Sequence, residues 1–181
     1  FKERWQHRAL LPAGIVVGVL FAAEFWFVAE GLNRTTASHM SVFLYTAPIW
    51  AAVGLHLKIP EERLSGRQWI GIATAFLGIA VAFLVPTIGD GSASLTPEML
   101  LGDLLALAAG AAWGLTTVAV RVSRLSAAPP TQTLFYQLAI SFVLLTVVTV
   151  LIGQLHFVST PTAWLSLGFQ AVVIAFGSYL V

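Results

Sequence analysis

The sequence predicts an all-α polytopic membrane protein, and three observations support that prediction. Hydrophobic residues make up 58% of the chain and charged residues only 9%, with a mean hydropathy of +0.89, which is far from the balance of a soluble domain. The apolar residues form long runs. The charged residues stand mainly between these runs, so the runs are expected to be membrane spans.

Six apolar segments have a length of about 17 to 25 residues, enough for an α-helix to cross about 30 Å of hydrocarbon. We therefore expect six transmembrane helices, at Ala9–Glu30, Ala37–Leu57, Gln68–Val85, Pro97–Val120, Thr133–Ile152 and Ala163–Val181.

The first segment combines a stripe of small residues with a carboxylate. Gly14, Gly18 and Ala22 recur every four residues, a spacing that lets two helix backbones approach closely. Glu24 points away from that stripe on a helical wheel. A carboxylate at this depth has to face protein or a water-filled cavity. Glu24 is therefore predicted to line a cavity; the alternatives are a structural hydrogen bond to a neighbouring helix or a position near the interface beside Glu30.

The second segment contains a proline and a polar stripe. Pro48 lacks the N–H that would bond to the carbonyl of Leu44, so the helix is expected to kink there, with Pro48 as a hinge. His39, Thr46 and Trp50 are spaced by seven and four residues and share one face. This face is predicted to contact a ligand, while a lone histidine near a helix end is also common as an interfacial or hydrogen-bonded residue.

Local signals mark several helix ends. Ser65 and Gln68 form a capping box that opens the third segment, and Pro86 is expected to end it. Thr96-Pro97 and Thr160-Pro161 each place an N-cap hydroxyl before a proline at the first helical position. These pairs are expected to start the fourth and sixth helices.

The fourth segment carries a second stripe of small residues, which is also expected to pack closely against other helices. It consists of Gly102, Ala106, Gly110 and Gly114. Asp103 lies beside this stripe, and a packed structural role is expected for it in preference to contact with a ligand.

The last three segments contain aromatic, amide and hydroxyl groups at membrane depth. If these groups converge, they form an apolar pocket with a few polar anchors, suited to an amphipathic small molecule. For Trp113 and Tyr179, a place in an aromatic belt at the membrane interface agrees with the sequence as well as a place in the pocket does. The residues are Trp113, Tyr136, Gln137, Gln170, Ser178 and Tyr179.

Lysine and arginine are distributed unequally between the two sides of the predicted bundle. The leader Lys2–Arg8, the turn Lys58–Arg67 and the turn Arg121–Arg124 hold eight of them, whereas the opposite side has only Arg34. Because basic residues in short loops favour the cytoplasm, the N-terminal leader is predicted to be cytoplasmic. The expected location is the bacterial inner membrane.

Other function classes find little support in the sequence. The absence of cysteine excludes disulfides and thiolate metal sites. No Gly-rich phosphate loop, His pair at metal-ligand spacing or Ser/His/Asp motif is present, so we predict no cofactor, metal or catalytic residue. Basic residues are too few and too scattered for binding nucleic acid.

The order and spacing of several short motifs resemble the EamA branch of the drug/metabolite transporter superfamily, over essentially the whole chain. The motifs are Thr35–Ser38 before the helix with Pro48, Glu62–Ser65 followed by Gln68–Gly71, and Leu101–Leu107 running to Trp113 and Arg121. The resemblance implies a ten-helix fold made of two inverted five-helix repeats. This chain would be a fragment with the third to eighth helices: residues 1–86 end the first repeat, 87–99 form an external loop and 100–181 start the second repeat.

The same resemblance implies a transporter, not an enzyme, that exports small organic solutes by alternating access. Aromatic amino acids or amphipathic drugs are the expected solutes, in a monomer or a homodimer within the lipid bilayer. Glu24 and His39 would be polar or proton-responsive groups of the pathway, and Trp50, Trp113 and Tyr179 its stacking surfaces. The alternatives are a non-transporting membrane scaffold or assembly subunit and an integral-membrane enzyme.

Overall fold

Within the described residues, each of the six predicted segments contains helix, with ends shifted by a few residues. The computed structural model describes residues 7–89, 96–154 and 159–176, and the chain divides into two units, 1–146 and 147–181. The predicted site residues Ser178 and Tyr179 lie outside the described residues. The main helices are α1 (His7–Leu32), α2 (Ala37–Leu44), α3 (Ala47–Lys58), α4 (Gly66–Gly89), α5 (Pro97–Val122), α6 (Pro130–Leu151) and α7 (Pro161–Phe169).

Three short helical turns complete the described structure. Two 3₁₀ turns, η1 (Pro60–Glu62) and η2 (Arg124–Ala127), connect α3 to α4 and α5 to α6. In the second unit, α7 continues as a π-helix, η3 (Gln170–Phe176).

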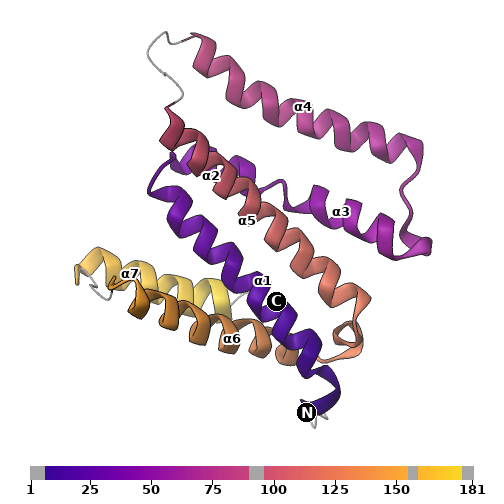
Figure 1. Cartoon of the computed structure of the whole chain (residues 1–181), viewed down its shortest axis with the longest axis vertical. Coiled ribbons are helices and arrows are strands. Elements are labelled where there is room, and N and C mark those ends of the chain that lie inside the picture. Colours follow the sequence, from indigo (N-terminus) through magenta and orange to yellow (C-terminus); the bar gives the residue numbers. More distant parts are fainter. Residues whose placement is uncertain (1–6, 90–95, 155–158, 177–181) are drawn as a thin grey trace. The chain divides into compact units, whose positions relative to one another are not determined.

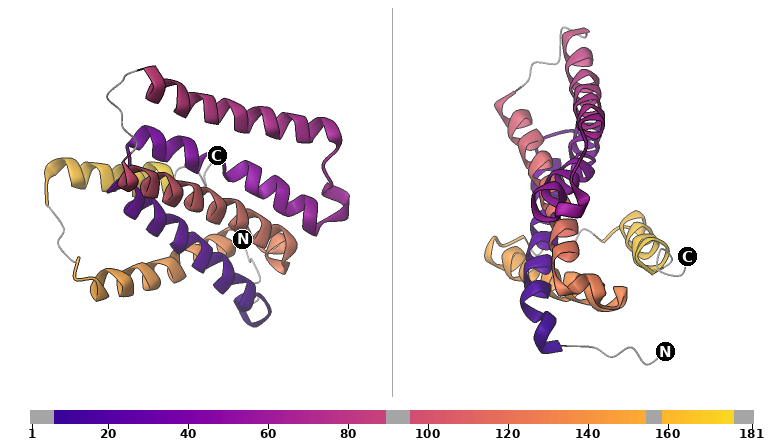
Figure 2. Two further views of the ribbon diagram at one scale, coloured as in Figure 1. Left: turned by 45° about the horizontal axis from the view of Figure 1, so that its top comes forward. Right: turned by 90° about the vertical axis from the view of Figure 1, so that its right-hand side faces the viewer.

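Helix α5 is the centre of the first unit, with α1 on one side and α2 and α3 on the other (Figure 1, Figure 2). The stripe of small residues on α5 makes this possible. A Cβ added at Gly110 would lie 2.7 Å from the carbonyl oxygen of Phe43, and one at Gly114 would lie 2.6 Å from that of Ala47. The prediction that this stripe packs against other helices is confirmed.

The stripe on α1 packs against a different helix. Gly14 lies under the ring of Tyr136 of α6, and Gly18 lies under Ile140, one turn further along α6. Tyr136 also joins the buried apolar cluster that it forms with Leu10, Val17 and Leu125. Small residues on α1 therefore leave room for the large side chains of α6.

The second predicted segment is broken into two helices. Helix α2 ends at Leu44, and α3 begins at Ala47 with Pro48 in its first turn, where a missing N–H is harmless. The hydroxyl of Thr46 supports the break because it donates to the carbonyl of Phe43 at 2.6 Å. The predicted kink at Pro48 is corrected to a break just before it.

The capping signals agree with the structure, with one exception. The hydroxyls of Thr96 and Thr160 each accept a backbone hydrogen bond at the start of α5 and α7. The side chain of Gln68 accepts from both the N–H and the hydroxyl of Ser65, so one of the two bonds of a capping box is present. The expectation that Pro86 ends its helix is wrong, since α4 continues to Gly89. Proline removes one helical hydrogen bond, and a membrane helix tolerates that loss.

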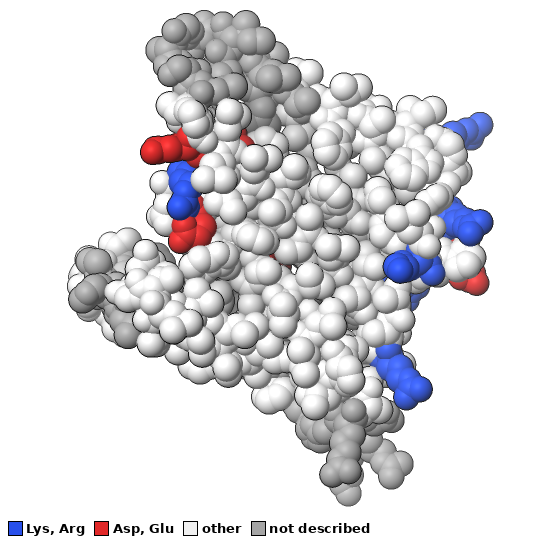
Figure 3. Space-filling view, in the orientation of Figure 1, with Lys and Arg blue, Asp and Glu red and all other residues white. Residues whose placement is uncertain are grey.

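Charged side chains collect at the two ends of the first unit. On the face shown in Figure 3, a band without charged side chains separates the two ends. Among the described residues, one end has a single basic side chain, Arg34, which pairs with Glu30. The other end contains Lys58, Arg63, Arg67, Arg121 and Arg124. The predicted asymmetry of basic residues is therefore an asymmetry in space.

Helices of membrane-spanning length agree with this charge pattern. Within the described residues, four stretches are long and apolar enough to cross a bilayer: Ala9–Leu32, Ala37–Lys58, Pro97–Val122 and Pro130–Leu151. The chain is therefore an integral membrane protein, and the uncharged band corresponds to the hydrocarbon region.

Candidate functional site

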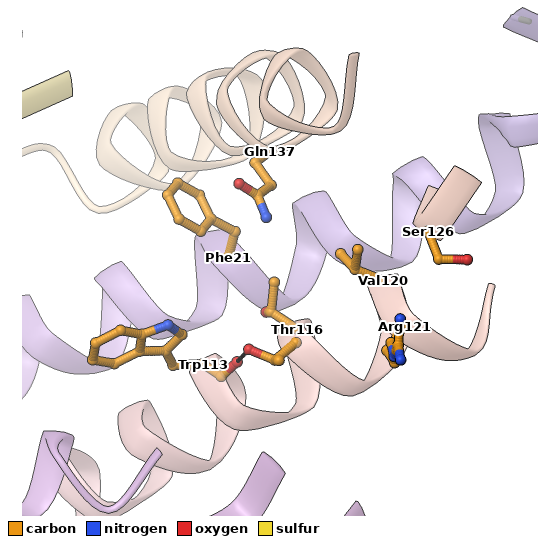
Figure 4. A pocket seen from close by; sticks show the side chains of 8 residues that line it. Phe21, Trp113, Thr116, Val120, Arg121, Ser126 and Gln137 are labelled. Carbon is orange, nitrogen blue, oxygen red and sulfur yellow. Dashed lines mark hydrogen bonds between the residues drawn. The ribbon is translucent and has the colours of Figure 1, made fainter. Parts of the chain in front are cut away.

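A pocket of about 460 Å³ opens between α1, α5, η2 and α6, all within the first unit. Such a volume is typical of sites for small molecules. Figure 4 shows side chains from these four elements around one space. The lining residues are Phe21, Trp113, Thr116, Thr117, Val120, Arg121, Ser126 and Gln137.

The walls of this pocket differ in character along α5. Trp113 with Phe21 of α1 supplies aromatic surface, whereas Arg121, two turns along the helix, supplies a positive charge. Between them, the hydroxyls of Thr116 and Thr117 donate to carbonyls of their own helix. The pocket therefore has an apolar end and a cationic end.

Gln137 is the polar group that α6 contributes to the pocket. Its side chain makes no hydrogen bond to another described residue, so both its amide donors and its carbonyl acceptor are available to a ligand. Of the predicted site residues, Trp113 and Gln137 are the two that the structure brings together in this pocket.

A second, more apolar pocket of about 440 Å³ lies on the other side of Trp113. Its lining includes Pro48 and Ala51 of α3, and it shares Trp113 and Thr117 with the first pocket. Trp113 therefore stands between the two spaces. Tyr45, at the helix break, lies beside its ring with a centroid separation of 6.2 Å.

Thr46 and Trp50 lie together, but they face a helix and not a pocket. The indole Nε1 of Trp50 donates to the hydroxyl of Thr46 at 3.1 Å, and Thr46 is fully buried. Both side chains contact the face of α5 that carries Gly110 and Gly114. The stripe predicted from spacing exists, and His39 extends it towards the end of the bundle.

His39 has a protein partner at the end of α5. Its Nδ1 lies 3.1 Å from each carboxylate oxygen of Asp103, and the hydroxyl of Thr35 donates to the same carboxylate at 2.5 Å. Asp103 is 9% exposed. These bonds tie the turn between α1 and α2 to α5, which is the packed structural role predicted for Asp103.

Glu24 is buried in helix packing and does not line any of the pockets described above. Its residue is 8% exposed, and its Oε2 has no hydrogen-bond partner among the described residues. Helices α1 and α5 run antiparallel, with Gly31 beside Gly102 and Leu10 in a cluster with Leu125. This register puts Glu24 at the level of Gly110, near the middle of α5.

Tyr136 contributes to the core and not to the pocket. It is 5% exposed, its ring covers Gly14, and its hydroxyl accepts from the amide of Gln132 at 3.4 Å. Gln132 is fully buried, and its carbonyl oxygen has no partner in the described part of the chain.

Sequence reasoning missed most of the pocket lining, including Phe21, Thr117 and Arg121. One signal was present: Trp113, Thr117 and Arg121 recur every four residues and so share a face of α5. Arg121 belongs to a basic turn and to a motif of the family resemblance, and it is not among the predicted site residues. Phe21 and Ser126 carry no comparable signal, because their proximity to α5 depends on how the helices pack.

The comparison with known families gives one match. The description of the EamA-like transporter family fits residues 1–84 and 100–181. No curated protein and no solved structure shows significant similarity to the chain.

Proposed function

The chain belongs to the EamA-like transporter family, and from that premise we propose that it exports small amphipathic solutes through the pocket beside Trp113. The family is one of membrane transporters of small solutes and not of enzymes. Export as the direction, and the identity of the solute, are our proposals.

The observation that carries this proposal is the two-sided character of the pocket. An amphipathic solute needs an apolar surface and a few polar anchors. Phe21 and Trp113 offer the first, whereas Gln137 and Arg121 offer the second. Solutes with an aromatic ring are favoured because Trp113 can stack against them.

Aromatic amino acids and amphipathic drugs are the solute classes that we propose. We base this choice on the aromatic-rich helices, which we compare with those of the exporter YddG; that comparison implies aromatic amino acids and cationic drugs as substrates. We propose that the wider pathway also includes Ser178 and Tyr179, and that Thr46, Trp50 and Tyr136, which are packed between helices in this structure, border it only when those helices move.

Alternating access is the proposed mechanism, with two inverted repeats separated at residues 87–99. The break before Pro48 is a natural hinge, because a discontinuous helix lets its two halves rotate separately. Trp113 lies between the two pockets on either side of α5, so movement of α3 would change the space around its ring. The basic end is proposed to face the cytoplasm of a bacterial cell.

Flux of labelled phenylalanine and leucine into proteoliposomes tests this function, with the protein as the cell makes it. We expect saturable flux that favours phenylalanine. The variant Trp113→Ala should lose this preference, while Trp164→Ala is a matched control that removes a half-exposed tryptophan that is not among the residues lining the pocket. Equal flux of both solutes, or an unchanged preference in Trp113→Ala, would contradict the proposed role of the pocket. Absence of flux from folded protein would favour a scaffold.

Glu24 and His39 are proposed as proton-responsive groups of the pathway. Replacing Glu24 by Gln should reduce transport without loss of folded protein, because the amide keeps the shape of the side chain and removes its ionisation. Glu30→Gln, on the same helix but in an exposed pair with Arg34, is the control. Unchanged flux in Glu24→Gln, with and without a pH gradient, would remove Glu24 from the mechanism.

A further inference from the structure

Resting on the proposed function, we propose that Arg121 binds the carboxylate of the solute and that Glu62 competes with the solute for this site. The solute class is thereby narrowed to amphipathic carboxylates. Cationic drugs without a carboxylate would bind poorly.

The charge of the pocket supports this assignment. Among the described residues that line it, Arg121 alone has an ionisable side chain, and the other polar groups are neutral hydroxyls and the amide of Gln137. A guanidinium attracts a carboxylate strongly when the two meet in a partly apolar site. An ammonium group would find no acidic side chain among these lining residues.

The position of Arg121 matches a solute with a ring at one end. Trp113 and Arg121 are eight residues apart on one helix, which is about 12 Å along its axis. Both side chains lean towards the N-terminus of α5, so the lean leaves this separation unchanged, and the flexible Arg121 side chain has to reach back along the helix to meet the solute. A solute with its ring on Trp113 would direct its polar end towards Arg121, as Figure 4 allows the reader to follow.

Arg121 is already held by an exchangeable partner. Its Nε and Nη2 each lie 2.9 Å from one oxygen, Oε1, of Glu62 in η1. The side chain of Arg121 is 60% exposed, and exposed ion pairs are weak. The guanidinium has five donors, so three remain for a second carboxylate. A solute can therefore share or displace Glu62.

Displacement would have a structural consequence. Glu62 belongs to the turn between α3 and α4, and its pair with Arg121 connects that turn to the end of α5. When a solute carboxylate takes the place of Glu62, this connection is released. Occupancy of the pocket is thereby coupled to the α3–α4 turn.

The test compares phenylalanine with phenethylamine, which has the same ring and amine but no carboxylate. Their half-saturating concentrations are measured by flux in proteoliposomes for the wild type and the variants Arg121→Gln, Glu62→Gln and Arg124→Gln. Arg124 is the control because it is a basic residue near the same end of α5 and does not line the pocket.

Arg121→Gln should raise the half-saturating concentration of phenylalanine about tenfold or more, the usual effect of losing a charged hydrogen bond, and leave that of phenethylamine unchanged. Glu62→Gln should lower the value for phenylalanine, because the guanidinium loses its competitor. Arg124→Gln should match the wild type. Glu62→Gln also breaks the ion pair, so it separates loss of the pair from loss of the binding group.

Two results would overturn the proposal. In the first, Arg121→Gln raises the half-saturating concentrations of both solutes equally. In the second, Glu62→Gln raises the half-saturating concentration of phenylalanine as much as Arg121→Gln does. Flux of neither solute in the wild type would refute the proposed function and not this site. In that case, equilibrium binding of labelled phenylalanine to the purified protein tests the role of Arg121. Binding that depends on Arg121 supports the proposal, and absence of binding overturns it.

Discussion

Replacing Gly110 by alanine should destabilise the protein, because this glycine lies against backbone that cannot easily move. An added Cβ would lie 2.7 Å from both the carbonyl oxygen of Phe43 and the hydroxyl of Thr46, and 3.0 Å from the carbonyl oxygen of Leu44. Ordinary contacts of a Cβ begin at 3.4 Å, so α5 would have to move by about 0.7 Å from the helix break.

The magnitude follows from two opposing effects. Alanine favours a helix over glycine by about 1 kcal/mol. Overpacking typically costs about 1 to 3 kcal/mol, and the upper part of that range applies here because the atoms contacted are mainly backbone. We expect Gly110→Ala to lower the free energy of unfolding by about 1 to 2 kcal/mol after the gain in helix propensity.

Gly71 of α4 provides a matched control. It is helical as well, but no atom lies within 4 Å of a Cβ added there. Gly71→Ala should therefore leave stability unchanged or raise it by up to about 1 kcal/mol. Both variants replace a helical glycine by alanine, so they share the gain in helix propensity and differ only in what the added methyl group contacts.

Unfolding of both variants in mixed micelles of a mild detergent with increasing SDS, followed by tryptophan fluorescence, measures the difference. The reasoning would be refuted by Gly110→Ala being as stable as Gly71→Ala. Such a result would mean that α5 does not approach the α2–α3 break as closely as described.

Two further changes test the polar contacts around α5. Asp103→Ala leaves the hydroxyl of Thr35 and the ring of His39 without their shared acceptor, so unfolding in the same titration should become easier by about 1 to 3 kcal/mol; a stability equal to that of the wild type would contradict the structural role. Thr46→Val keeps the shape of a fully buried side chain but removes the hydroxyl that Trp50 and Phe43 use, and should cost about 1 to 3 kcal/mol. No loss in Thr46→Val would show that the hydroxyl does not support the helix break.

Several features of the fold were predictable because their causes are local in the chain. Length and hydropathy identified the four spans found among the described residues, since the bilayer sets the length of a helix that crosses it. Thr96 and Thr160 marked helix starts because an N-cap bonds to an N–H three residues ahead. The stripe containing Gly102, Gly110 and Gly114 was readable because helical periodicity fixes which residues share a face.

Other features depended on contacts between distant residues. Spacing alone could not distinguish a kink at Pro48 from an interruption at Tyr45–Thr46, because the helix there lies against Gly110, far away in the sequence. The wheel position of Glu24 predicts a side chain directed away from the glycine stripe of α1, and only the structure shows that this carboxylate is 8% exposed.

The sequence alone determined that this is a helical membrane protein of the EamA-like family, which stripes of its helices pack and at which end its basic residues collect. Only the tertiary structure decided which side chains share a pocket. In the sequence, Arg121 is one more basic residue in a turn. It becomes a candidate binding residue because the packing of α1, α5, η2 and α6 places it on the wall of the same pocket as Phe21 and Gln137. Periodicity fixes the face of one helix, whereas a pocket requires the relative position of several helices, and that position is set by contacts spread over the whole bundle.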